Sequence, residues 1–304
     1  MYLYHFGIRE LPFTLTPNTS FFYGLPSHIE ASEVLLTALK SGEGFIKVTG
    51  EVGTGKTLIC RKFLNELPAH FQSAYIPNPL LSPDELRRAV ASELGVDIGQ
   101  TCDQQRFTQC IQERLIDINA QQRSAVLVID EAQALPVESI EALRLMTNLE
   151  TESRKLLQVV LFGQPELNQK LSMPELRQLK QRITFSYSLS HMDTDQIYHY
   201  VKHRLVVAGH PGEEVFDLAC CRLMFMATKG TPRLVNVLCH KAMMLAYGEG
   251  KYKVDVSHIK LAIADTEATT LPWYASLALW PSLVAAGAVV SVTLASVLEL
   301  GGMV

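Results

Sequence analysis

One stretch of the chain, Gly50-Glu51-Val52-Gly53-Thr54-Gly55-Lys56-Thr57, has the pattern G-x-x-x-x-G-K-[ST] of a phosphate-binding Walker A loop. A β-branched run precedes it at residues 45–49, and residues 58–67 can form a helix. Strand, loop and helix in this order bring a bound phosphate to the backbone N–H groups at a helix N-terminus. The sequence therefore predicts an α/β nucleotide-binding domain. We expect the loop and the following Leu58 to surround the phosphates of ATP, Lys56 to contact the β- and γ-phosphates, and Thr57 to bind Mg²⁺.

A second motif follows the apolar run at residues 124–129, which is typical of a strand buried on both faces of a parallel sheet. The run ends in Asp130 and Glu131, at the end of a strand where the sites of α/β proteins collect. This arrangement has the form of a Walker B element. We expect Asp130 to hold Mg²⁺ through water and Glu131 to orient and deprotonate the attacking water. The alternative is that the two acids only cap the next helix.

A third buried-strand run, at residues 156–163, ends at Gln164. A polar side chain at this strand end can contact the γ-phosphate or the attacking water, so Gln164 is predicted as a catalytic sensor, with Asn168 behind it. An ordinary strand-to-loop turn is the alternative reading.

Three arginines are candidates for contacts with phosphate. Arg182 directly precedes the last predicted strand, and we expect it to reach the γ-phosphate of a neighbouring copy as an arginine finger. Arg177 is the alternative finger, and both side chains can simply be solvated. Arg233 follows Gly230-Thr231-Pro232 at the start of a helix, from which it would contact the nucleotide. A surface salt bridge is the alternative for Arg233.

Composition excludes several other classes of protein. The 304 residues carry a formal net charge of −4 and no run of Lys or Arg, so no dedicated nucleic-acid binding is expected. The six cysteines contain no C-x-x-C pair, which argues against a disulfide framework or a zinc site. His199 and His203 lack the acidic neighbour of the H-E-x-x-H motif, so metal binding there is not expected.

The C-terminal segment has a different character, because no charged residue occurs from Leu271 to Leu298. A helix over residues 281–298 would span about 27 Å, close to the thickness of the bilayer hydrocarbon core. We expect residues 277–298 to contain a single membrane-spanning helix. Lysines occur on its N-terminal side and no basic residue follows it, which predicts a cytoplasmic N-terminal domain. A buried core helix is the alternative.

Together these motifs resemble the AAA+ ATPases. Four further segments resemble the secretion ATPases of the ExeA/GspA type: PFTLTPNTSFFY at residues 12–23, DEAQ at 130–133, GQPEL at 163–167 and GTPR at 230–233. The resemblance covers about residues 1–266. It implies a homo-oligomeric, inner-membrane ATPase that works with the assembly proteins of a type IV pilus, such as a mannose-sensitive haemagglutinin (MSHA) pilus, or of a type II secretion apparatus.

The predicted fold is a P-loop core with a five-stranded parallel sheet flanked by helices, a small helical lid and a C-terminal transmembrane helix. The expected boundaries are residues 1–190 for the core, 191–266 for the lid and 267–304 for the membrane-anchoring tail. The predicted activity is hydrolysis of ATP to ADP and phosphate. Three alternatives stay open: a DNA-handling AAA+ ATPase of the transposition type, a nucleotide-gated scaffold with little hydrolysis, and a small-molecule kinase.

Overall fold

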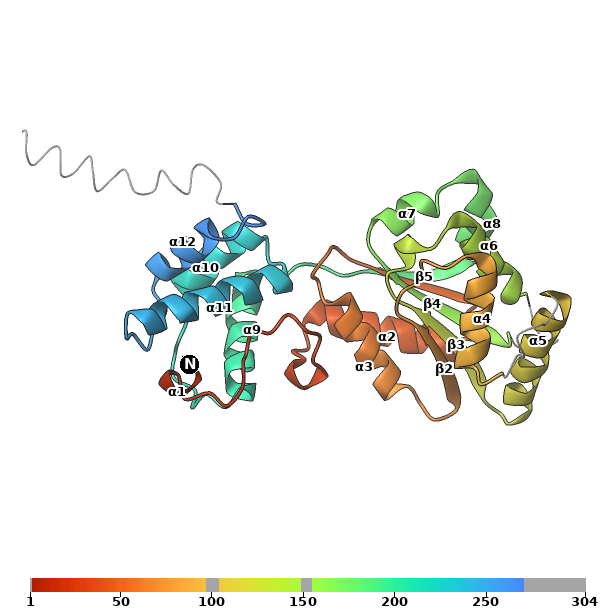
Figure 1. The fold of residues 1–304 in the computed structure, drawn as a ribbon, viewed down its shortest axis with the longest axis horizontal. Helices are drawn as coiled ribbons and strands as arrows, with labels where there is room; N and C mark the ends of the chain where they lie inside the picture. Colours follow the sequence, from red (N-terminus) through yellow and green to blue (C-terminus); the bar gives the residue numbers. More distant parts are fainter. Residues whose placement is uncertain (1, 97–103, 149–154, 271–304) are drawn as a thin grey trace, which may run out of the picture.

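The computed structural model describes residues 2–96, 104–148 and 155–270. Its centre is a parallel sheet with the strand order β2-β3-β4-β1-β5 (Figure 1). The strands are β1 (Phe45–Thr49), β2 (Phe71–Ile76), β3 (Ser124–Ile129), β4 (Leu157–Gly163) and β5 (Ile183–Ser188). The predicted five-stranded parallel sheet is confirmed. Every residue of β4 is buried, as expected for a continuous apolar run at the middle of a parallel sheet.

Helices cover both faces of the sheet. On one face, α2 (Pro26–Lys40) and α3 (Lys56–Glu66) share a hydrophobic cluster with the strands. The other face is covered by α4 (Pro83–Glu93), α5 (Gln104–Ala120), α6 (Val137–Met146), α7 (Glu166–Lys170) and α8 (Arg177–Arg182). Short 3₁₀ turns occur at Ala132–Ala134 (η2) and Pro174–Leu176 (η3). The helices cover the two faces of the sheet, and the predicted motifs all follow the carboxyl ends of its strands, at one end of the sheet.

A separate helical unit follows the sheet (Figure 1). It consists of α9 (Thr194–Val207), α10 (Leu218–Thr228), α11 (Pro232–Gly248) and α12 (Val256–Ala264), whose buried faces share one hydrophobic cluster. The helix α10 begins at Leu218, after a short extended segment. Phe216 forms a β-bridge with Val254, and the Asp217 side chain accepts a hydrogen bond from the Cys220 N–H at 2.7 Å, so the helix is capped at Asp217.

The N-terminal segment packs with this helical unit. It includes α1 (Tyr2–His5) and the 3₁₀ turn η1 (Thr19–Phe21), and its side chains from Tyr2 to Leu25 join the cluster of α9 to α12. Figure 1 shows this red segment running beneath the lid helices before it enters α2. The boundaries expected at residues 190 and 266 stay predictions. The structure adds that residues 2–25, which the expected boundaries assign to the core domain, pack into the hydrophobic core of the lid.

The predicted membrane-spanning segment, residues 277–298, lies outside the described residues. Within the described ranges, which end at residue 270, every helix is too short or too polar to cross a membrane.

Candidate nucleotide-binding site

The Walker A loop connects β1 to α3, as its sequence predicts. Gly53 and Gly55 have φ angles of 84° and 99°, a region that side chains with a Cβ rarely occupy. A Cβ on Gly53 would also lie 2.7 Å from the Cβ of Arg233, so the loop approaches the lid closely. Thr54 closes the turn by donating from its hydroxyl to the Glu51 carbonyl oxygen at 2.8 Å. The backbone thus curves around a space at the N-terminus of α3.

Lys56 lies in the middle of this loop and is only 4% exposed. Its Nζ donates to the carbonyl oxygens of Gly50 and Glu51, at 2.8 and 3.0 Å. Burial lowers the pKa of the ammonium, although Glu131 and Asp130 nearby act in the opposite direction. Among the described residues, no carboxylate forms an ion pair with Lys56. A phosphate group would therefore supply the anionic partner that this buried cation lacks.

Asp130 supplies a buried carboxylate beside Thr57. It is 2% exposed, and its carboxylate accepts hydrogen bonds from the Thr57 hydroxyl and, at 2.9 Å, from the Glu131 N–H. Burial raises the pKa of Asp130, against the effect of these two hydrogen bonds. Carboxylate and hydroxyl oxygens are the ligands that Mg²⁺ prefers, so Asp130 and Thr57 fit the predicted metal role.

Glu131 occupies a left-handed backbone conformation, with φ 51° and ψ 37°. Its Oε2 accepts hydrogen bonds from Nε2 of Gln133 at 2.5 Å and from Nε2 of Gln164 at 3.0 Å. Burial acts to raise the pKa of Glu131, but these two hydrogen bonds and the charge of Lys56 outweigh it, and the net pKa lies below its ordinary value. Glu131 is therefore held as an anion, the form that a general base requires.

The lid contributes Arg233 from the first turn of α11. Its backbone N–H donates to the Gly53 carbonyl oxygen at 3.2 Å, which ties the start of α11 to the Walker A loop. Pro232 fits this position because a first-turn residue needs no N–H partner within the helix. The contact places Arg233 beside the phosphate-binding loop.

A cavity of about 210 Å³ lies between the core, the lid and the N-terminal segment. The predicted site residues that line it are Val52, Gly53, Gly55, Lys56, Thr57, Leu58, Glu131, Gln164 and Arg233. Gly50, Glu51, Thr54 and Asp130 support this wall from behind through the contacts given above. Tertiary structure thus brings the ends of β1, β3 and β4 together with the lid.

Several residues of the cavity were missed from the sequence. Thr14 to Asn18 of the N-terminal segment line it, and Arg204 enters from α9. Arg204 is 5% exposed, and its side chain donates to the Pro12 carbonyl oxygen at 2.5 Å and to the Tyr200 hydroxyl at 2.9 Å. His28 of α2 lies behind the Walker A loop, where its Nε2 donates a hydrogen bond to the Thr54 carbonyl oxygen at 3.0 Å, because a carbonyl oxygen can only accept. The aromatic residues between Tyr2 and Tyr23 left open whether this segment packs near the adenine or only covers the core.

Three predicted residues lie elsewhere. Arg182 directly precedes β5, and the first residue of β5 pairs with the first residue of β1. Arg182 therefore lies at the amino-terminal end of these strands, opposite the end that carries the Walker A loop. Its Nη1 donates to Oδ1 of Asn148 at 2.5 Å. Arg177 is at the start of the same short helix. Neither arginine is among the residues that line the nucleotide cavity of its own copy. Asn168 is also occupied elsewhere, since its Oδ1 accepts from Nζ of Lys47 at 2.5 Å.

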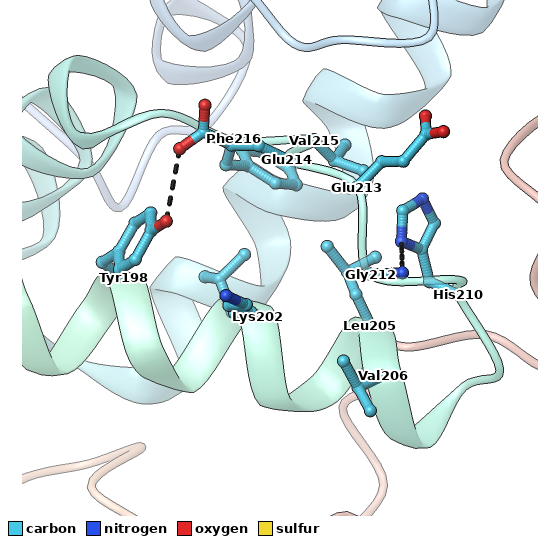
Figure 2. A pocket seen from close by; sticks show the side chains of 11 residues that line it. Tyr198, Lys202, Leu205, Val206, His210, Gly212, Glu213, Glu214, Val215 and Phe216 are labelled. Carbon is cyan, nitrogen blue, oxygen red and sulfur yellow. Dashed lines mark hydrogen bonds between the residues drawn. The ribbon is translucent and has the colours of Figure 1, made fainter.

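A smaller pocket of about 40 Å³ lies in the lid, between α9 and the loop before α10 (Figure 2). Tyr198 donates to Glu214 at 3.2 Å across one end of it, and His210 accepts from the Gly212 N–H at the other. Its lining includes none of the predicted site residues, and its volume is too small for a nucleotide.

Comparison with known proteins gives the family of this chain. Residues 39–171 match an AAA domain family, AAA_22. The chain is 41% identical over 265 residues to general secretion pathway protein A of Aeromonas hydrophila, and the match covers 86% of this chain and 48% of that protein. The chain therefore spans about half of the length of this curated relative.

Similar folds occur in solved structures. Cdc6p from Pyrobaculum aerophilum has a TM-score of 0.63 at 17% identity, over 83% of this chain and 69% of that one. The Aeropyrum pernix ORC2 protein, in ADPNP–ADP complexes, has a TM-score of 0.60 at 13% identity, over 85% and 74%. Drosophila ORC bound to DNA has a TM-score of 0.61 at 20% identity, over 84% and 64%. At these identities the likeness shows the fold alone.

Proposed function

Because the nucleotide-binding region of this chain is an AAA+ ATPase domain of the ExeA/GspA type, we propose that the protein binds ATP with Mg²⁺ and hydrolyses it to ADP and phosphate. The observation that carries the proposal is the convergence of Lys56, Glu131, Gln164 and Arg233 on one cavity between core and lid. Lys56 begins α3, Glu131 and Gln164 follow the ends of β3 and β4, and Arg233 belongs to the lid helix α11. Their charges and hydrogen-bonding groups match what phosphoryl transfer to water requires.

In the proposed reaction, the water oxygen forms a bond to the γ-phosphorus while the bond from that phosphorus to the leaving oxygen of ADP breaks. The Glu131 carboxylate accepts the proton of the water. Lys56 and Arg233 stabilise the negative charge that spreads over the phosphoryl oxygens. Gln164 orients the water or the γ-phosphate. Thr57 and Asp130 would hold Mg²⁺, which supplies charge neutralisation for the phosphates.

The active unit is proposed to be a homo-oligomer. Arg182 lies at the far edge of its own sheet and would complete the site of a neighbouring copy, with Arg177 as the alternative finger. The GspA relationship supports partners in a secretion or pilus-assembly machine at the inner membrane. The finer assignment to an MSHA-type pilus rests on the resemblance to its biogenesis protein MshM. Anchoring through residues 277–298 belongs to the same proposal, as does a cytoplasmic ATPase domain.

ATP turnover by the purified full-length chain in detergent or liposomes tests the enzymatic proposal. Replacement Glu131→Gln removes the base while it keeps the size of the side chain. We expect this variant to bind ATP as the wild type does and to lose about 10²- to 10⁴-fold in turnover. Lys56→Ala should lose ATP binding as well.

The outcome that contradicts the proposal is a wild type that binds ATP yet turns over no faster than Glu131→Gln, even when it is oligomeric. That result would favour the nucleotide-gated scaffold. Salt-dependent binding of DNA by the wild type would instead revive a DNA-handling role.

A further inference from the structure

Gln133 links the two strand ends that carry the proposed base and sensor. It lies in η2, the turn that follows Glu131. Its Nε2 donates to Oε2 of Glu131 at 2.5 Å, and its Oε1 accepts from the backbone N–H of Gln164 at 3.0 Å. Both polar atoms of one side chain are therefore engaged, one at the end of β3 and one at the end of β4.

The turn that carries Gln133 is itself anchored. Nζ of Lys170, at the end of α7, donates to the carbonyl oxygens of Gln133 and Leu135, both at 2.6 Å. The space beside the turn is small, since a Cβ on Gly163 would lie 3.3 Å from Oε1 of Gln133 and 2.8 Å from Leu167. The backbone and the side chain of Gln133 are thus both restrained, which is what a group that orients another residue requires.

The hydrogen bonds on Glu131 are unevenly distributed between its two oxygens. Oε2 accepts from Gln133 and from Gln164, whereas Oε1 accepts from no residue in the part of the chain that the structure describes. Glu131 lines the nucleotide cavity, so the unengaged oxygen belongs to a side chain that reaches the reaction space. Two donors on one oxygen leave the other oxygen to accept a proton from water.

We propose that Gln133 is a positioning residue for ATP hydrolysis, which holds Oε2 of Glu131 so that Oε1 receives the proton of the attacking water, and which fixes the strand end that carries Gln164. This inference rests on the proposed ATPase function and deepens it. Gln133 does not contact the nucleotide cavity, because the lining includes Glu131 and Gln164 but not Gln133. It acts through those two residues.

Replacement Gln133→Met tests this role, because methionine has a similar length and volume but neither hydrogen-bonding group. We expect kcat for ATP to fall about 10- to 100-fold, a part of what a general base contributes, with KM changed by less than about twofold. Gln133→Glu should be more damaging, since it keeps the acceptor for Gln164 but places a second carboxylate against Glu131.

The matched control is Gln158→Met on β4, the strand that ends at Gln164. The Gln158 amide also bridges two partners, the carbonyl oxygens of Leu39 and Glu43, at 3.1 and 3.0 Å, but it lies at the end of β4 away from the nucleotide cavity. It reports what the loss of a buried amide costs the fold alone. We expect it to lower stability without a comparable loss in kcat.

A second measurement separates this inference from the proposed activity. Binding of ADP alone and of ADP with Mg²⁺ and aluminium fluoride, which imitates the phosphoryl group during its transfer, is compared in the full-length protein without turnover. A loss of about 10-fold or more in affinity for the aluminium fluoride complex, with an unchanged affinity for ADP, in Gln133→Met but not in Gln158→Met supports the inference. Equal affinities of Gln133→Met and the wild type for that complex, or an unchanged kcat in an active enzyme, overturn it. An inactive wild type whose affinity for the aluminium fluoride complex still depends on Gln133 contradicts only the proposed function.

Discussion

Gly230 lies where the lid meets the segment that leads from β5 into α9. Its φ angle is 77°, and a Cβ built on it would lie 1.9 Å from the carbonyl oxygen of Met192 and 2.8 Å from its carbonyl carbon. The two backbones are also joined by a hydrogen bond from the Met192 N–H to the Gly230 carbonyl oxygen at 3.0 Å. Replacement Gly230→Ala therefore forces one backbone away from the other, since no side chain can rotate to make space.

The cost can be worked out in two parts. An alanine in the left-handed region costs about 1–2 kcal/mol wherever it occurs. The contact of 1.9 Å must open to at least 3.4 Å to become an ordinary one. Such a shift adds about 1–3 kcal/mol of overpacking and about 0.5–1.5 kcal/mol for the weakened backbone hydrogen bond. We expect Gly230→Ala to lower the free energy of unfolding by about 2.5–6.5 kcal/mol.

Gly250 provides the matched control. It has a similar φ of 70°, follows α11 in the same lid, and has no atom within 4 Å of its added Cβ. Gly250→Ala should cost only the backbone part, about 1–2 kcal/mol. In urea denaturation followed by circular dichroism, the midpoints of the two variants should differ by about 1–2 M, for a slope of about 1–3 kcal/mol/M. ATP affinity should fall only in Gly230→Ala, because Arg233 lies on the displaced turn. Equal midpoints for the two variants would refute the reasoning.

Two further predictions concern the site. Asp130→Asn should raise the free energy of unfolding of the nucleotide-free protein at neutral pH, by about 0.5–2 kcal/mol, and abolish the Mg²⁺ dependence of ATP binding. Burial raises the pKa of Asp130 in the folded protein above its value in the unfolded chain. As the pH rises from the lower to the higher of these two values, the unfolded chain releases the proton while the folded protein keeps it, so the folded state loses stability. Denaturation of the wild type and of Asp130→Asn at several pH values from acid to neutral measures this loss of stability. If the free energies of unfolding of the two proteins change with pH in parallel, the prediction is wrong. Arg182→Ala should lose about 10³- to 10⁵-fold in turnover yet regain activity when mixed with Lys56→Ala, because each defect lies in a different half of a shared site. If only Arg177→Ala behaves in this way, the finger is Arg177.

Much of the core was predictable from short segments. The glycines of the Walker A loop, the apolar runs of β3 and β4, and the acids that follow β3 each act within a few residues of the chain. The helix α4 shows the same locality, since Ser82 and Glu85 form the capping box that their spacing predicts. Backbone sterics, side-chain periodicity and local hydrogen bonds decide such features, so a sequence read alone reveals them.

Other parts of the site depend on contacts between distant segments. The cavity exists because β4 lies between β3 and β1, which brings Glu131, Gln164 and Lys56 to one edge. Packing of residues 2–25 on the lid places Thr14 to Asn18 in the cavity wall, although the aromatic pattern there is equally compatible with the core. The pairing of Gln133 with Glu131 and Gln164 has no separate signal in the sequence, where it is one glutamine in a turn.

The chain by itself thus determined that a phosphate loop, a Walker B strand, a polar strand end and a lid arginine are present. Tertiary structure decided how they meet: which oxygen of Glu131 is engaged, which arginine lies at the far edge of the sheet, and which domain the N-terminus joins. The physical reason is the range of the interactions. Local conformation depends on neighbouring residues, whereas strand order and side-chain pairing across strands depend on how apolar faces far apart in the sequence bury each other.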